Sequence, residues 1–199
     1  MGYNRAGFDE IVGVDIKPQP RYPFAFVQGD PLEYIAAHGR EFDAIHASPP
    51  CQAYSALRSV TDDRLYPHLI EKTRRACLSA GRLYVIENVP RAPLVHAITI
   101  CGLALGLRVK RHRLFESNVL LFGLDCPCHD GEWYHVSGHG SRARQRTNAR
   151  SPRREARGVA HAREVMTLDK MTMQELSQAI PPAYTEFIGR QLLAALRRA

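Results

Sequence analysis

Two hydrophobic periods alternate along the first half of the chain. Short apolar runs predict β-strands over residues 10–16, 24–30, 42–47 and 82–88, and helical spacing predicts helices over residues 31–38 and 64–80. Strands that are separated by helices are typical of crossover units, which build a parallel sheet with both faces covered. The pattern therefore predicts an α/β fold.

The second half of the chain is less regular. An apolar segment over residues 98–107 is followed by a basic run that predicts a strand over residues 108–115. Residues 123–163 are rich in glycine, histidine and arginine and have little periodicity, so we expect long loops or a small irregular lobe there. Helices are predicted over residues 173–179 and 182–198, the second with Pro182 in its first turn.

Length and composition limit the class of protein. A chain of 199 residues with 45% hydrophobic residues favours one domain with a sizeable core. No apolar run approaches the length of about 18 residues that a membrane-spanning helix needs. Five cysteines, an odd number, without a secretory leader indicate reduced thiols. We therefore expect a cytoplasmic protein that does not enter a membrane.

Positive charge is concentrated in one segment. The formal net charge is +7, and residues 141–157 contain seven arginines against the single acid Glu155. Such a patch is typical of a surface that binds a polyanion. A solvated loop in an arginine-rich proteome explains the composition equally well.

Polar groups follow four of the predicted strands, where the carboxyl ends of a parallel sheet collect reactive groups. Asp15 suits a ribose, because a carboxylate accepts hydrogen bonds from both hydroxyls, and Asp30 could face an adenine. For either acid alone, a turn or helix cap is the simpler interpretation. The other two groups are the turn at residues 48–52 and the pair Glu87 and Asn88.

Cys51 is the strongest candidate for a nucleophile. Pro49 and Pro50 fix the loop that presents it after a buried strand, and a helix N-terminus just beyond it would favour the thiolate. Cys77 and Cys101 lack such a loop, and we interpret them as small buried hydrophobic residues.

Charged residues near the next strands are candidates for binding a base. Partial burial would raise the pKa of Glu87 and let it donate a proton to a bound base, although it could equally be a structural acid. Arg111 and Arg113 alternate on the predicted strand and so should share a face, where they could hold a phosphate or a base edge. An exposed basic strand edge is the alternative.

Four motifs occur in a characteristic order: SPPCQAYS at residues 48–55, ENVP at 87–90, RHRLF at 111–115 and AIPPAYTEFIG at 179–189. With them the chain resembles the cytosine-C5 DNA methyltransferases over nearly its whole length, most of all the compact forms of phages and prophages. The resemblance implies a Rossmann-like methyltransferase sheet that uses S-adenosyl-L-methionine, with helices on both faces and a small irregular target-recognition region. It also implies double-stranded DNA as the partner, and a monomeric protein in a bacterium or a phage-infected host.

The resemblance assigns roles to individual residues. A flipped cytosine would be attacked at C6 by Cys51, with Glu87 at N3 of the base and Asn88 orienting it. Arg111 and Arg113 would complete the catalytic group. The cofactor side would comprise Phe8, Asp15, Ile16, Asp30, Pro49 and Pro50. DNA contacts would come from Gln52, Tyr54, Ser55, Arg142, Arg144 and Arg146.

The chain departs from the family at its start. The family opens with a strand and a glycine-rich turn that holds the methionine part of the cofactor, whereas this sequence begins with MGYNRAGF. Loss of that central strand would leave its neighbours unpaired. Two alternatives therefore stay open beside the methyltransferase: an inactive, truncated DNA-binding remnant, and a cytosine-5 methyltransferase that acts on RNA. We expect a catalytic core over residues 1–117, target recognition over 118–161, and core-completing helices over 162–199.

A group of potential metal ligands falls in the irregular region: Cys126, Cys128, His129, His135 and His139. Their C-x-C-H spacing is not that of the usual zinc knuckles, which begin with two cysteines separated by two to four residues. We therefore expect no metal and interpret this segment as a polar loop that faces DNA.

Overall fold

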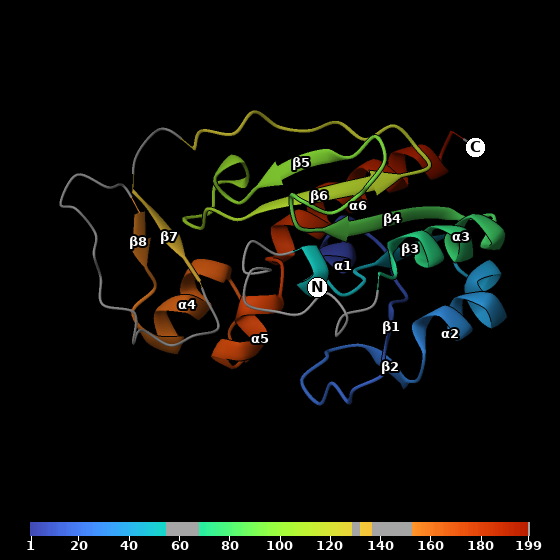
Figure 1. Cartoon of the computed structure of the whole chain (residues 1–199), viewed down its shortest axis with the longest axis horizontal. Coiled ribbons are helices and arrows are strands. Elements are labelled where there is room, and N and C mark those ends of the chain that lie inside the picture. Colours follow the sequence, from blue (N-terminus) through green and yellow to red (C-terminus); the bar gives the residue numbers. More distant parts are fainter. Residues whose placement is uncertain (55–67, 129–131, 137–152, 199) are drawn as a thin grey trace. The chain divides into compact units, whose positions relative to one another are not determined.

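The structure, a computed structural model, describes residues 1–54, 68–128, 132–136 and 153–198 (Figure 1). It is a mixed α/β protein that divides into two compact units. Unit 1 comprises Met1–Phe8, Ile100–Arg111 and Leu124–Arg190, and unit 2 comprises Asp9–Thr99, His112–Gly123 and Gln191–Ala199. These units differ from the three consecutive segments that the sequence suggested, because the chain passes between the units several times. None of the helices in the described part combines the length and apolar character needed to cross a bilayer.

Unit 2 contains most of the strands. A two-stranded parallel sheet joins β1 (Val12–Asp15) to β2 (Ala25–Gln28). A four-stranded sheet has the order β3-β4-β6-β5, with β3 (Ala44–Ala47), β4 (Leu83–Asn88), β5 (Ile98–Cys101) and β6 (His112–Ser117). The strands predicted over the first half of the chain are confirmed in shorter form.

The prediction of an all-parallel sheet is wrong, because β6 runs antiparallel to β4. A parallel return needs a crossover, usually a helix. The described residues 89–111 between the two strands contain β5 and one 3₁₀ turn, Leu103–Leu105, but no α-helix. The strand predicted over residues 108–115 also begins later than expected, since Val109 forms an isolated bridge with Tyr134.

Helices cover one face of the four-stranded sheet. The helix α2 (Pro31–His38) begins where predicted, because Asp30 accepts hydrogen bonds from the backbone N–H groups of Leu32 and Glu33 and Pro31 suits the first turn. The helix α3 (Ile70–Ala80) packs through Cys77 and Ala80 on β3 and β4. Residues 64–67 of the longer helix that was predicted lie outside the described residues.

The opposite face of this sheet is buried as well. Val85 and Phe115, which point away from the α3 side, are fully excluded from solvent. Both faces are therefore covered, as the crossover pattern predicts.

Unit 1 contains more regular structure than the predicted irregular lobe. It has α1 (Gly2–Ala6), a parallel pair of β7 (Trp133–His135) and β8 (Arg153–Glu155), α4 (Gly158–Met166) and α5 (Met173–Gln178). The helix α6 (Pro182–Leu196) begins in this unit and ends in unit 2. A core of Val109, Val136, Val165, Met166 and Leu176 joins α4 and α5 to the residues in and beside β7.

A buried ion pair fastens α3 to the sheet. Glu116 on β6 is 2% exposed, and its carboxylate lies 2.6 Å from Nε of Arg74. It also accepts a hydrogen bond of 2.7 Å from the backbone N–H of Val95. Burial alone raises the pKa of Glu116, but the hydrogen bonds from Arg74 and Val95 outweigh it and hold the pKa below its usual value.

We predict that Glu116→Gln lowers the free energy of unfolding by about 3 kcal/mol, because it leaves the guanidinium of Arg74 without its buried counter-charge. Glu71→Gln is the matched control. Glu71 contacts the same arginine, but its side chain is 55% exposed, so its loss should cost far less. Urea denaturation of the three proteins measures the difference, and equal losses would contradict the assignment.

Candidate active site

The loop that carries Cys51 is tied to the end of β4. In the parallel β3–β4 register Ala47 faces Ile86, so two residues further on Pro49 reaches the level of Asn88. The side-chain amide of Asn88 donates a hydrogen bond of 2.9 Å to the carbonyl oxygen of Pro49. Asn88 is buried, and its Oδ1 accepts from the N–H of Val89. The loop therefore leaves β3 in a fixed direction.

Cys51 follows this anchor and has a half-buried, free thiol. Its carbonyl oxygen accepts a hydrogen bond of 3.0 Å from the N–H of Tyr54, which closes the 3₁₀ turn Gln52–Tyr54. The helix N-terminus expected after Cys51 is thus a single 3₁₀ turn in the described residues. The hydroxyl of Tyr54 lies 3.1 Å from Nδ1 of His68, and Gln52 is exposed.

Glu87 and Arg113 form an ion pair beside this loop. Nε of Arg113 lies 2.9 Å from Oε1 of Glu87, which is 7% exposed. In the antiparallel β4–β6 register Glu87 faces Phe115, so Arg113 occupies the diagonal position on the same face. A guanidinium at this distance stabilises the negative charge of the carboxylate.

The site therefore combines four kinds of functional group at the adjoining ends of β3, β4 and β6. They are the thiol of Cys51, the amide of Asn88, the carboxylate of Glu87 and the guanidinium of Arg113. Such a set can supply a nucleophile and hydrogen-bonding groups for a planar polar ring. All four residues belong to unit 2.

Arg111 does not join this group, and the prediction that it shares a strand face with Arg113 is wrong. It precedes β6 and belongs to unit 1. Its guanidinium is buried and donates to four carbonyl oxygens, those of Val136, Leu176, Ser177 and Ala179. Several of these oxygens lie at the end of α5, where backbone carbonyls have no helical partner. Arg111 therefore caps a helix, and its donors are occupied.

The predicted cofactor residues lie at the ends of the first two strands. The carboxylate of Asp15 closes β1 and accepts from the N–H of Lys17 at 2.9 Å and from Nε2 of Gln19 at 3.0 Å. Asp30 caps α2, as described above, and Ile16 is exposed.

The remaining members of that group fall elsewhere. Pro49 and Pro50 belong to the Cys51 loop. Phe8 belongs to unit 1 and packs edge-on against Tyr3. Of the predicted DNA contacts, Ser55, Arg142, Arg144 and Arg146 lie outside the described residues.

The cysteines depart from the prediction that all thiols are reduced. Cys126 and Cys128 form a disulfide, whereas Cys51, Cys77 and Cys101 are free. The Cα atoms of Cys126 and Cys128 lie 5.4 Å apart, within the range that a disulfide spans. Of the histidines proposed with them, His135 lies on β7, and His129 and His139 are outside the described residues.

Comparison of the chain with models of known protein families gave no match, and comparison with curated proteins gave none either. The assignment of a function therefore depends on the residues of the site and on the elements that hold them.

We predict that His46 makes the stability of the fold depend on pH. Burial lowers its pKa to about 4, whereas a histidine in an unfolded chain has a pKa of about 6.5. As the pH falls from about 6.5 towards 4, the unfolded chain binds a proton that the folded protein does not, so the free energy of unfolding decreases. His46→Gln should remove this part of the slope in urea denaturation.

His38→Gln serves as the control, because His38 is exposed on α2. This variant should keep the slope of the wild-type protein. An unchanged slope in His46→Gln would show that another group is responsible.

Proposed function

We propose that the chain transfers a methyl group from S-adenosyl-L-methionine to C5 of cytosine in double-stranded DNA, through a covalent bond between Cys51 and C6. The observation that carries the proposal is the cluster at the ends of β3, β4 and β6. The Cys51 loop is fixed by Asn88, and the Glu87–Arg113 pair lies beside it. The order of the sequence motifs supports the same assignment.

The strand order also supports a methyltransferase sheet. A doubly wound sheet has the order 3-2-1-4-5-6. If strand 1 of that order is removed, strands 3 and 2 remain paired on one side of the gap, and strands 4 and 5 remain paired on the other. The pairs β2-β1 and β3-β4 match this arrangement, and they are not joined to each other within the described residues.

The residues of the cluster suit attack on a pyrimidine ring. C5 of cytosine is a poor nucleophile until a group adds to C6. Addition of the Cys51 thiolate forms an S–C6 bond and moves an electron pair towards C5 and N3. Glu87, once it has taken up a proton from solvent, shares this proton with N3 and so neutralises that charge, and its other oxygen accepts a hydrogen bond from the N4 amino group. Arg113 holds this carboxyl group in place.

The cofactor supplies an electrophilic methyl group when it is bound. After C5 has been methylated, loss of the C5 proton to a base and cleavage of the S–C6 bond return Cys51 to its thiolate. Extrusion of the base from the duplex must precede these steps, because C5 and C6 are inaccessible in the base stack.

The residues at the ends of β1 and β2 fit the adenosine part of the cofactor. Asp15 accepts two hydrogen bonds from its own loop, and a carboxylate has acceptor sites for about four. It therefore retains capacity for ribose hydroxyls. For the methionine part, the described residues contain no glycine-rich turn after a strand.

We predict that a covalent complex forms on DNA that contains 5-fluorocytosine in place of cytosine, because fluorine blocks loss of the C5 substituent. The duplex should be long and of mixed sequence, so that it contains whichever short recognition sequence the protein requires. The complex should survive denaturing electrophoresis, require S-adenosyl-L-methionine and disappear in Cys51→Ser. Cys77→Ala should retain it, because burial raises the pKa of the Cys77 thiol to about 11 and disfavours its thiolate.

The other outcomes of this experiment separate the alternatives. An adduct that persists in Cys51→Ser contradicts the assigned nucleophile. Salt-sensitive binding of the duplex without adduct or cofactor binding supports the remnant. An adduct on fluorinated RNA, and none on DNA, supports the RNA enzyme.

We predict that Glu87→Gln and Arg113→Gln each slow adduct formation by about 10² to 10³, because the first removes the acid that shares its proton with N3 and the second removes the guanidinium that holds this acid in place. If the two side chains act as one pair, the double variant should be only slightly slower than either single variant. Unfolding midpoints measured in parallel separate a loss of catalysis from a loss of fold. Wild-type rates in Glu87→Gln would contradict the role of this acid.

A further inference from the structure

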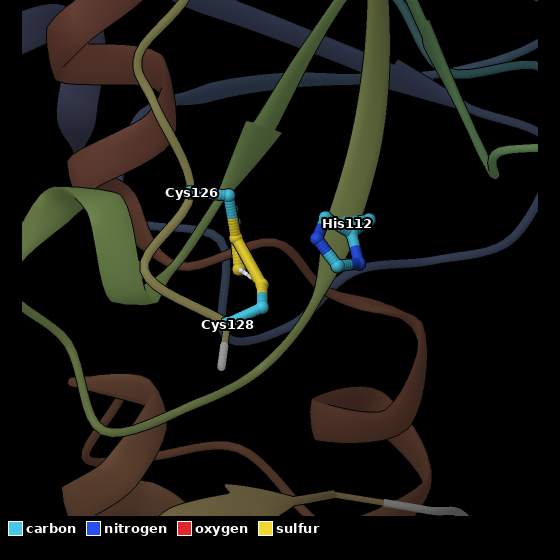
Figure 2. A group of neighbouring side chains, drawn as sticks. His112, Cys126 and Cys128 are labelled. Atoms are coloured by element: carbon cyan, nitrogen blue, oxygen red, sulfur yellow. Dashed lines mark hydrogen bonds between the residues drawn. A yellow bond between two sulfur atoms is a disulfide. The ribbon is translucent and has the colours of Figure 1, made fainter. Parts of the chain in front are cut away.

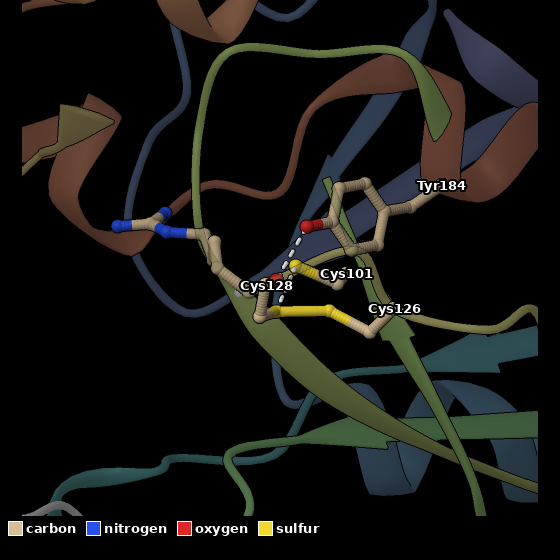
Figure 3. The surroundings of a disulfide bond; sticks show 5 residues. Cys101, Cys126, Cys128 and Tyr184 are labelled. Atoms are coloured by element: carbon tan, nitrogen blue, oxygen red, sulfur yellow. Dashed lines mark hydrogen bonds between the residues drawn. A yellow bond between two sulfur atoms is a disulfide. The ribbon is translucent and has the colours of Figure 1, made fainter. Parts of the chain in front are cut away.

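Three of the five cysteines gather in unit 1. Cys101 ends β5, and Cys126 and Cys128 lie on the segment that returns to this unit at Leu124. Their sulfur atoms all lie within 4.8 Å of one another. Figure 2 shows the disulfide between Cys126 and Cys128, and Figure 3 shows Cys101 beside it, with its Sγ 3.7 Å from that of Cys128.

We propose that these three cysteines, once the disulfide is reduced, bind a zinc ion whose fourth coordination position is taken by water. Thiolates are soft ligands that select zinc, and three protein ligands with a water molecule in the fourth position are an established arrangement. Zinc–sulfur bonds of about 2.3 Å in a tetrahedron separate neighbouring sulfur atoms by about 3.8 Å. The distance of 3.7 Å between Cys101 and Cys128 matches that edge.

The surroundings hold Cys101 rigidly. The next residue, Gly102, packs so closely that an added Cβ would meet the carbonyl oxygen of Val109, and the hydroxyl of Tyr184 lies near the same point. Figure 3 shows Tyr184 beside the three cysteines. Cys101 itself is 1% exposed. Burial of a lone cysteine needs no ligand, but three sulfur atoms brought together from two separate segments provide most of a metal site.

The chemistry balances with an ordinary thiol reductant. Reduction of the Cys126–Cys128 disulfide takes two electrons and two protons from a dithiol, which becomes oxidised. Zinc binding then releases the three thiol protons, and the ion with its three thiolates carries a net charge of −1.

The test is a titration of the full chain with Co²⁺ after reduction by a phosphine and removal of the reductant without oxygen. Wild-type protein should bind one equivalent, with visible d–d bands of tetrahedral cobalt and near-ultraviolet bands of thiolate coordination, and one equivalent of Zn²⁺ should displace it. Cys101→Ser, Cys126→Ser and Cys128→Ser should each weaken binding by more than about 100-fold. Cys77→Ala should bind as the wild type does.

His135→Ala, which removes a histidine on β7 of the same unit, should bind as the wild type does. Circular dichroism shows whether each variant folds. Alkylation of the wild-type protein gives a second measurement that needs no variant: Zn²⁺ should protect Cys126 and Cys128 and leave Cys51 reactive.

Three results would overturn the proposal. They are a folded, reduced wild-type protein that binds no Co²⁺, a Cys101→Ser variant that binds as tightly as the wild type, and alkylation of Cys126 and Cys128 at the same rate with and without Zn²⁺. Exchange of the disulfide to Cys101 and Cys128 without metal uptake would also contradict a metal site and indicate a redox group instead.

Discussion

The antiparallel pairing of β4 with β6 is the constraint on which the candidate site depends. Its register places Glu87 diagonally across from Arg113 on one face and Glu116 level with Ile86 on the other. Glu116 there meets Arg74 of α3. Because side chains alternate between the faces of a strand, a shift of β6 by one residue would move both Arg113 and Glu116 to the opposite face of the sheet and break both ion pairs. One register therefore fixes both the ion pair that anchors α3 and the ion pair of the site.

The pairing of β3 with β4 brings the Cys51 loop next to the end of β4. Parallel neighbours end at the same edge of a sheet, so the Cys51 loop and the end of β4 are adjacent without any contribution from distant segments. The Asn88–Pro49 hydrogen bond then fixes the first residues of the loop. Buried polar groups that already have their partners need little rearrangement when charge develops nearby, which is the physical basis of preorganised catalysis.

The features that were predicted correctly from the sequence are those that depend on neighbouring residues in the chain. The helix over residues 31–38 was predicted with its observed bounds, since Asp30 and Pro31 form a start signal within the chain. The strand ends that carry Cys51 and Glu87 followed from apolar runs and their polar tips. The direction of β6, the start of that strand and the role of Arg111 depend on partners far along the chain, such as Tyr134 and the end of α5, and no local pattern contains them. The grouping of Cys101 with Cys126 and Cys128 was missed for the same reason.

Three consecutive residues of one sequence motif have different structural roles. Arg111 caps α5 in unit 1, His112 opens β6, and Arg113 pairs with Glu87 in unit 2. If both arginines were on one strand, their side chains would lie on the same face and could share a role. However, β6 begins at His112, after Arg111. The start of β6 therefore separates a structural role from a role in the candidate site, although the two arginines are only two residues apart in the sequence.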